Sequence, residues 1–155
     1  MAPSTASLRL AAPCSDIDVP PGYRRLVIPT GFMQICGDFY LHDTEPVMAA
    51  RITAAHLNLQ GIVHGGFLAT LADSAYGAIL RRDDRDLMPR TVQLSVNYLG
   101  AVHEGEFVEA RVTFNRVGRR LAYGNCDVSV ADRMVLQTTA VFSVMPATPA
   151  DQVSP

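Results

Sequence analysis

The sequence HLNLQGIVHGGFLATLADSAYGAIL, residues 56–80, decides the fold. From Gly65 onward its length and composition predict a helix, and at 100° per residue the larger apolar side chains share one broad face. The opposite face carries small residues and Asp73, which is the one charged residue between Gly65 and Leu80. Because a surface helix normally carries several charged residues, we expect this helix to be buried on most of its sides.

The chain after this helix changes to the two-residue period of strands. Apolar and polar residues alternate in TVQLSVNYL, residues 91–99, so one face is expected to hold Val92, Leu94, Val96 and Tyr98. Three more segments rich in Val, Phe, Tyr and Thr predict strands joined by short polar hairpins, at roughly residues 107–117, 121–130 and 134–144.

A domain boundary is expected near each end of the chain. PVMAARIT, residues 46–53, predicts a short strand, whereas residues 31–41 allow no assignment. One long helix followed by a meander of four strands indicates an α+β domain, with the helix laid on an antiparallel sheet. We expect this domain to span residues 21–146, between flexible segments at residues 1–20 and 147–155. A transit peptide is the alternative reading of the first segment, which opens with Ser and Arg and no acidic residue.

Composition and charge argue against several classes of protein. The 155 residues include 48% hydrophobic and 18% charged residues, a balance that favours an oligomer with an apolar interface. A formal net charge of −2 without any basic run argues against nucleic-acid and membrane partners. Three widely spaced cysteines without a CxxC pair argue against a disulfide framework or a zinc site and favour the cytoplasm.

Gly65 and Gly66 begin the predicted helix directly after His64. The first turn of a helix offers unpaired backbone N–H groups and a partial positive charge, and glycines let a ligand approach the backbone. Such an N–H can polarise a carbonyl and hold the oxyanion that forms when water attacks it. The alternative reading of the two glycines is a tight turn from loop into helix.

Asp73 is the second candidate for chemistry, because burying a carboxylate among apolar residues is unfavourable unless it is partnered. Such surroundings could raise its pKa towards the range of a general base. The alternative is an aspartate that reaches solvent on the face of small residues. Gly65 and Asp73 are eight residues apart, about 12 Å along a helix. Both therefore cannot contact one carbonyl within a single chain, whereas a two-fold dimer would bring them together at two sites.

Residues 56–75 resemble the signature HxNxxGxxHGGxxxxLxDxA of hotdog-fold acyl-CoA thioesterases of the phenylacetate-pathway (PaaI-like) type. Every position of this pattern is matched, and the order of helix and strands extends the resemblance to residues 38–145. It implies a hotdog fold, in which a sheet wraps a long central helix, that dimerises through sheet and helix edges and often pairs again into a tetramer. It also implies hydrolysis of aliphatic or aryl acyl-CoA thioesters to free acid and CoA, without a metal or a separate cofactor.

The resemblance implies a role for each residue of the site. Asp73 would activate water or attack the thioester itself, and the Gly65 N–H would polarise the thioester carbonyl. Asn58 would hold the nucleophilic water, His64 would support the loop or polarise the carbonyl, and Thr91 would donate a hydrogen bond near the carboxylate. Asn58, His64 and Gly65 would come from one subunit, and Asp73 and Thr91 from its partner.

Ordinary structural roles are the alternatives for several of these residues. His64 could cap the turn, and Asn58 could be a turn residue. His56 is expected to satisfy backbone groups of its loop. Core packing is the default reading for the apolar helix residues that could line an acyl pocket, namely Phe67, Leu68 and Tyr76.

Arginines are the candidates for binding the phosphates of CoA. Arg119 and Arg120 follow Gly118 in a predicted hairpin, and Arg90 precedes the strand that begins at Thr91. Guanidinium groups suit phosphate because they donate two parallel hydrogen bonds. The alternative for the arginine pair is a solvated turn.

Three other functions fit parts of this pattern. A hotdog hydratase or dehydratase would carry an Asp–His pair in a different helix-start motif, which this chain lacks. Binding of CoA esters without turnover would indicate a non-catalytic acyl-CoA binding domain. A salt-sensitive preference for acyl groups on a carrier protein would indicate a thioesterase for carrier-bound substrates.

Overall fold

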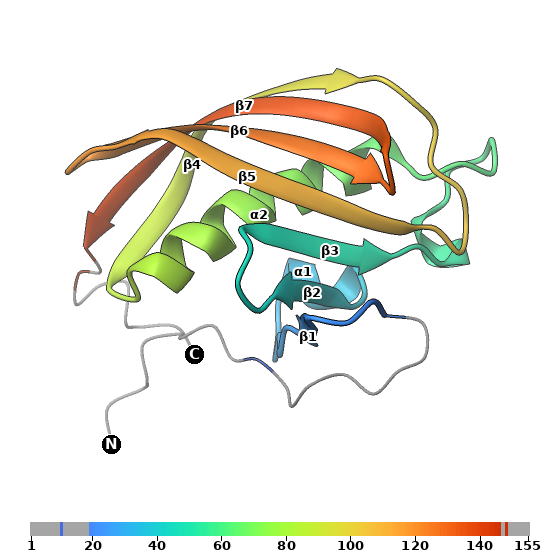
Figure 1. Cartoon of the computed structure of the whole chain (residues 1–155), viewed down its shortest axis with the longest axis horizontal. Helices are drawn as coiled ribbons and strands as arrows, with labels where there is room; N and C mark the ends of the chain where they lie inside the picture. The colour runs from blue at the N-terminus through green and yellow to red at the C-terminus, as the bar shows by residue number, and fades with distance from the viewer. Residues whose placement is uncertain (1–9, 11–18, 147, 149–155) are drawn as a thin grey trace.

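The computed structural model describes residue 10, residues 19–146 and residue 148. The flexible segments expected at both ends, and the transit peptide considered for the first, lie almost entirely outside the described residues. The elements follow the order β1 (Tyr23–Arg25), α1 (Phe32–Ile35), β2 (Phe39–His42), β3 (Val47–Arg51), the 3-10 helix η1 (Ala54–His56), α2 (Gly65–Asp83), β4 (Leu87–Tyr98), β5 (Phe107–Val117), β6 (Leu121–Val130) and β7 (Arg133–Pro146). The strands form one seven-stranded sheet in the order β1-β2-β3-β5-β6-β7-β4, which curves around α2 (Figure 1).

Helix α2 is buried because its apolar face points into the concave side of the sheet. This face is at most 9% exposed and consists of Phe67, Leu68, Leu71, Ala72, Ala75 and Ile79. Burial of each large aliphatic side chain stabilises the fold by about 1.5–3 kcal/mol. The helix continues beyond the predicted end to Asp83, and the basic Arg81 and Arg82 occupy its last turn, where positive charge complements the helix dipole. Neither described α-helix is long and apolar enough to cross a membrane.

The strands after α2 confirm the predicted meander. β5 and β6 have the predicted bounds, whereas β4 begins earlier, at Leu87, and β7 extends to Pro146. β5 pairs with β6, β6 with β7 and β7 with β4, each time antiparallel. The predicted α+β architecture, with a long helix wrapped by an antiparallel sheet, is confirmed.

A β-bulge in β4 corrects one part of the predicted alternation. The register with β7 shifts between Thr91 and Gln93, so Val92 is the extra residue of the bulge. Leu94 packs against the core as predicted, whereas Val92, which was expected on the same face, is 61% exposed. Because the bulge shifts the two-residue period, Thr91 lies on the inner face of the sheet, toward α2.

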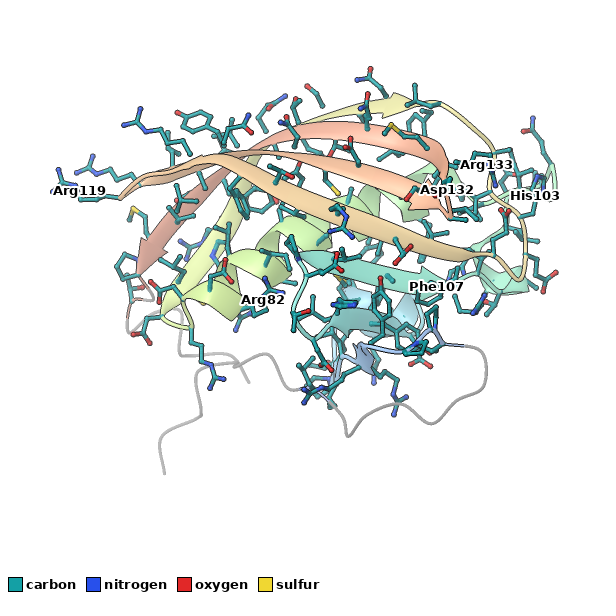
Figure 2. The ribbon with its side chains drawn as sticks, in the orientation of Figure 1. Arg82, His103, Phe107, Arg119, Asp132 and Arg133 are labelled. Atoms are coloured by element: carbon teal, nitrogen blue, oxygen red, sulfur yellow. The ribbon has the colours of Figure 1, made fainter. Side chains whose placement is uncertain are left out.

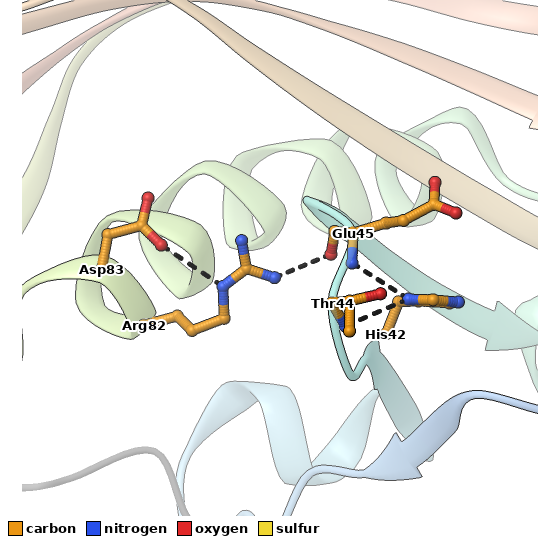
Figure 3. A network of polar contacts seen from close by, with 5 residues as sticks. All are labelled: His42, Thr44, Glu45, Arg82 and Asp83. Atoms are coloured by element: carbon orange, nitrogen blue, oxygen red, sulfur yellow. Dashed lines mark hydrogen bonds and ion pairs between the residues drawn. The ribbon is translucent and has the colours of Figure 1, made fainter.

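The C-terminal end of α2 is fixed to the turn between β2 and β3 (Figure 3). Arg82 donates a hydrogen bond from Nη1 to the carbonyl of Glu45 at 2.7 Å and pairs with Asp83 at 3.3 Å. His42 Nδ1 accepts hydrogen bonds from the backbone N–H groups of Thr44 and Glu45, which closes the same turn. These contacts fix α2 at the end that lies far from Gly65.

Residues 31–41, which allowed no assignment from sequence, contain α1 and the start of β2. α1 has four residues, none of them buried, and no side-chain cap. A hydrogen bond from Ser74 Oγ to Met33 Sδ, at 3.0 Å, connects it to α2. β1 and β2 then extend the sheet beyond β3.

Candidate active site

His64 is the N-cap of α2 and fixes the first turn of the helix. Its Nδ1 accepts a hydrogen bond from the Gly66 N–H at 2.9 Å, and its carbonyl accepts one from the Phe67 N–H. Because Nδ1 is an acceptor, the neutral ring carries its proton on Nε2, which can donate to a ligand. The capping role considered for His64 is therefore present, and it leaves a donor on the same ring available to a ligand.

The Gly65 N–H has no hydrogen-bond partner among the described residues. It lies in the first turn of a helix of 19 residues, where the helix dipole adds a partial positive charge. No acidic side chain occupies this turn. The position is thus suited to polarise a carbonyl or to stabilise an oxyanion.

Tyr98 supports Gly65, a contact that sequence reasoning missed. The Tyr98 hydroxyl donates to the Gly65 carbonyl at 2.9 Å. The tyrosine ring also covers the glycine, since a Cβ at residue 65 would lie 2.9 Å from Tyr98 Cε1. Tyr98 is thus a positioning residue for the Gly65 amide, and its ring would have to move to make room for a side chain at residue 65.

Asp73 lies in the middle of α2 and is half-buried. Thr91 Oγ1 donates a hydrogen bond to Asp73 Oδ1 at 2.7 Å. The bulge at Val92 makes this contact possible because it turns Thr91 to the inner face. Asp73 and Thr91 of one chain are therefore together, as the resemblance implied.

Asn58 organises the loop that leads to His64. Its Oδ1 accepts hydrogen bonds from the N–H groups of Gln60, at 2.8 Å, and Ile62, at 3.4 Å, so the turn role considered for it is present. Its Nδ2 has no partner among the described residues and remains a possible donor. Asn58, His64 and Gly65 thus follow one another in a single ordered loop and helix start.

His56 has the structural contacts that were expected of it. The Thr53 N–H donates to His56 Nδ1 at 2.9 Å, so Nε2 carries the proton and donates to the Cys36 carbonyl at 2.8 Å. The ring also lies against Phe67, with centroids 4.1 Å apart. His56 therefore joins the end of α1 to the loop before α2.

Tyr76 is a core residue, as expected. It is fully buried, and its hydroxyl lies 2.9 Å from Thr138 Oγ1.

The predicted arginines Arg119 and Arg120 lie at the end of the molecule opposite Gly65. Arg119 and Arg120, together with Arg116, line a groove at the β5–β6 hairpin, and Figure 2 shows Arg119 at the tip of this hairpin. The groove opens on the face of the sheet away from α2, because the lining residue Tyr123 alternates with buried neighbours. None of the three arginines has an ion pair with a described residue. Arg90 has a contact of its own and does not line this groove.

The described residues give less support to a cysteine nucleophile or a metal site. Burial raises the pKa of the Cys36 thiol, so this cysteine stays protonated and is a poor nucleophile. No group of three or more His, Cys, Asp or Glu side chains in the described part of the chain could hold a metal ion. The groups suited to chemistry are the Asp73–Thr91 pair and the start of α2.

The two parts of this site are separated within one chain. α2 is continuous from Gly65 to Asp83, so the Gly65 amide and Asp73 are about 12 Å apart along its axis. Asp73 with Thr91, and Gly65 with His64 and Asn58, are therefore the two groups that the structure brings together.

Replacing Tyr98 with phenylalanine is expected to lower kcat by about threefold to tenfold, because one hydrogen bond contributes roughly 0.5–1.5 kcal/mol. The ring would remain, so KM should change little and the folded structure should be retained. Steady-state kinetics with a CoA thioester would measure both values. Tyr23→Phe is the control, because it removes a hydroxyl–carboxylate contact with Glu109 that lies away from α2. A Tyr98→Phe variant with wild-type kcat would show that the hydroxyl does not position the amide.

Comparison with known proteins gives one consistent family. The family model of the thioesterase superfamily matches residues 60–137, from the loop before His64 into β7. Acyl-coenzyme A thioesterase 13 of Mus musculus is 24% identical over 102 residues, which cover 64% of this chain and 73% of that protein.

Solved structures are similar in fold as well. A hypothetical thioesterase of Streptococcus pneumoniae, crystallised with coenzyme A, is 27% identical with a TM-score of 0.58, over 63% of this chain and 78% of that one. A mutant of the phenylacetic acid degradation protein PaaI of Thermus thermophilus is 30% identical with a TM-score of 0.60, over 66% of this chain and 89% of that one. Both similarities extend well beyond the motif at residues 56–75.

Proposed function

Since the chain belongs to the thioesterase superfamily, we propose that it hydrolyses acyl-CoA thioesters at a site completed by two copies of itself. It is a thioester hydrolase with a hotdog fold of the PaaI-like type. One observation carries the proposal. The Gly65 N–H has no partner among the described residues, and the Asp73 carboxylate lies too far along the same helix to act on a carbonyl that this N–H holds. A relative named acyl-coenzyme A thioesterase and a similar structure that contains coenzyme A support CoA as the thiol component.

The proposed reaction begins with Asp73 of one subunit. Its carboxylate takes a proton from a water molecule while the water oxygen attacks the thioester carbonyl carbon; alternatively, the carboxylate attacks this carbon itself and water then hydrolyses the resulting anhydride. Thr91 donates to Oδ1 and so holds the carboxylate in one orientation. In either case, the carbonyl π electrons move to oxygen, and the C–S bond breaks as they return, which releases CoA thiolate.

The other subunit would stabilise the charge that develops on the carbonyl oxygen. Its Gly65 N–H donates to this oxygen, and the His64 Nε2–H is a second donor because Nδ1 is already used by Gly66. The Asn58 side-chain Nδ2, which has no partner among the described residues, would hold the attacking water. These donors are fixed before substrate binds, so little reorganisation is needed in the transition state.

A two-fold dimer would supply the missing half of each site. β4 ends the sheet, with no strand beyond it in the described part of the chain, and it carries the exposed apolar residues Val92 and Tyr98. A long, partly apolar edge strand readily pairs with a second copy. The small outer face of α2 would also let two helices approach closely. We therefore propose a homodimer, with pairing of dimers into a tetramer as the further step that the resemblance implies.

A panel of purified CoA thioesters tests the proposed function. The expected result is release of free CoA and acid from short, medium-length, long or aromatic acyl-CoA, followed with a thiol reagent. Tight binding of the esters without release would instead indicate a binding domain. Hydrolysis confined to acyl groups on a carrier protein would overturn CoA as the thiol component.

We also propose that Arg119 and Arg120 bind the phosphates of CoA. Three guanidinium groups without a carboxylate partner among the described residues converge on the hairpin groove, an arrangement that suits a polyanion. The β5–β6 hairpin lies on the side of the molecule where α2 ends (Figure 1), so the flexible pantetheine arm of CoA would extend from Asp73 toward this side and around the ends of the strands to the groove. Arg90 is kept as the third candidate, on β4, which β7 separates from β6 in the sheet. The free thiols of Cys36 and Cys126 suit the cytoplasm, where such substrates would be met.

Replacing Arg119 and Arg120 with alanine is expected to raise KM for acyl-CoA by about tenfold or more, because hydrogen bonds to charged groups contribute roughly 1.5–3 kcal/mol each. The kcat value should change little, since the reacting atoms are elsewhere. A thioester of N-acetylcysteamine, which lacks the phosphates, should be hydrolysed equally by the variant and the wild type. Arg24→Ala, on β1, is the control. An unchanged KM for acyl-CoA would contradict this assignment.

A further inference from the structure

A cavity lies between α1 and the start of α2. Its volume is ≈ 1440 Å³, and its walls come from residues 25–28 before α1, from α1 and the residues that follow it, from the segment 51–57 around η1, and from the first turns of α2. A cavity of about 150 Å³ is enough to hold a benzene molecule. The space is therefore much larger than a small acyl group such as acetyl requires.

This cavity reaches the proposed catalytic site. His64 and Gly66, which line it, are the two neighbours of Gly65 in the chain. Thr70, one turn further along α2, also lines the cavity and donates to the Gly66 carbonyl at 2.8 Å. A carbonyl oxygen held by the Gly65 N–H would thus have its carbon chain at the mouth of this space.

The wall formed by α1 carries two exposed apolar side chains beside that of Gln34. Phe32 is 65% exposed and Ile35 is 84% exposed, although both belong to a helix that lies beside α2. Leu57 and Phe67 contribute apolar surface from the opposite walls. Apolar side chains exposed together on one surface commonly mark a binding site.

The charged side chains of the cavity have polar partners, although Arg51 Nε has none among the described residues. Arg25 pairs with Asp38 at 3.3 Å. Arg51 donates from Nη1 to the Gly105 carbonyl at 2.8 Å, and its guanidinium lies 4.9 Å from the centre of the Phe107 ring. The cavity therefore suits a largely apolar chain whose one polar end lies near the start of α2.

α1 is attached to the rest of the fold at few points. His56 donates to the Cys36 carbonyl directly after α1, and Met33 accepts from Ser74. Gly37 follows with φ +101°, and a Cβ there would lie 3.1 Å from His56 Nε2, so only glycine fits this turn easily. These contacts fix the position of α1 and therefore the width of the cavity. The apolar side chains of α1 remain free to contact a ligand.

We propose that this cavity receives the acyl part of the thioester and that Phe32 and Ile35 on α1 determine which acyl groups are accepted. The inference rests on the proposed acyl-CoA hydrolysis and adds the substrate class: medium-length aliphatic or aryl acyl groups, in preference to acetyl and butyryl. The apolar wall of α1 covers the part of the acyl group beyond the carbonyl.

The test compares the kcat/KM values of the wild type and of Ile35→Trp, a change that narrows the cavity. The substrates are octanoyl-CoA, phenylacetyl-CoA and butyryl-CoA. We expect the wild type to have a higher kcat/KM for the two larger substrates. Ile35→Trp should lower the octanoyl-to-butyryl ratio of kcat/KM by about tenfold or more, because each methylene in an apolar pocket contributes roughly tenfold or more to discrimination. Met134→Trp, at an exposed apolar residue of β7 outside the cavity, should leave this ratio unchanged.

A second measurement reports on the cavity without catalysis. The chain has no tryptophan, so Phe32→Trp creates a single fluorescent reporter on α1. Octanoate should shift its emission to shorter wavelength in a saturable way, whereas acetate at the same concentration should not. The tryptophan emission of the Met134→Trp control should not respond to octanoate.

The outcomes separate this inference from the proposed function. Hydrolysis by the wild type, with an unchanged ratio in Ile35→Trp and no response of Phe32→Trp to octanoate, would overturn the acyl cavity alone. A response to octanoate in a protein that hydrolyses none of the CoA esters would overturn the proposed function and leave the apolar cavity as a binding site. Equal loss of activity on all three substrates in Ile35→Trp would also contradict a role in selection.

Discussion

Replacing Asp73 with asparagine is expected to lower kcat for a good acyl-CoA substrate by about 100- to 10,000-fold, the usual contribution of general acid–base catalysis. Asparagine keeps the size of the side chain and an oxygen that can still accept the hydrogen bond from Thr91. It cannot take a proton from water or attack a carbonyl carbon. The folded structure and KM should therefore be retained while turnover is lost.

Asp83→Asn is the matched control for this change. Asp83 lies at the C-terminal end of the same helix, is exposed, and pairs with its neighbour Arg82. Steady-state kinetics, with circular dichroism to follow the fold, should show wild-type turnover for this variant. A purified Asp73→Asn protein that is folded and fully active would remove Asp73 from the mechanism.

Replacing Gly65 with alanine is expected to lower kcat by about 100- to 1000-fold, the usual loss when one oxyanion donor is removed. An added Cβ would lie 2.9 Å from Tyr98 Cε1, so either the ring or the start of α2 must move. Any such movement would displace the N–H that we propose holds the carbonyl oxygen. Single-turnover kinetics would separate this loss in the chemical step from a change in binding.

Gly77→Ala is the matched control on the same helix. A Cβ at residue 77 would meet no other described atom within 4 Å beyond its own stretch of helix, so the start of the helix would be unaffected. Alanine also stabilises a helix relative to glycine, by about 0.5–1 kcal/mol. If both variants lost activity equally, the loss would come from α2 as a whole and the Gly65 amide would have no special function.

The central helix and the strands after it could be predicted from the sequence. The single charge between Gly65 and Leu80 indicated burial, and the apolar face is buried as expected. The alternation after residue 107 indicated strands whose bounds agree closely with β5 and β6. The motif residues could be named as candidates in advance, because their spacing resembles that of one family, and their roles stay predictions.

The remaining features depend on tertiary structure that local pattern does not show. α1 has four residues and none is buried, so it leaves no helical period to detect. Strict alternation put Val92 on the same face as Leu94, and only the bulge against β7 separates the two. The contact of Tyr98 with Gly65 joins residues 33 positions apart and follows from the register of β4. Arg116 likewise joins Arg119 and Arg120 only because β5 pairs with β6.

A mixture of two inactive variants tests most directly the claim that two chains complete each site. Asp73→Asn and Gly65→Ala proteins would be mixed in equal amounts under conditions of proven subunit exchange, and CoA release would be measured. In a hybrid dimer one site has both changes and the other has an intact Asp73 and an intact Gly65. Recovery to about a quarter of wild-type activity is expected, since half of the dimers are hybrids with one working site each. Proven exchange without any recovered activity would contradict a shared site and place the whole reaction within a single chain.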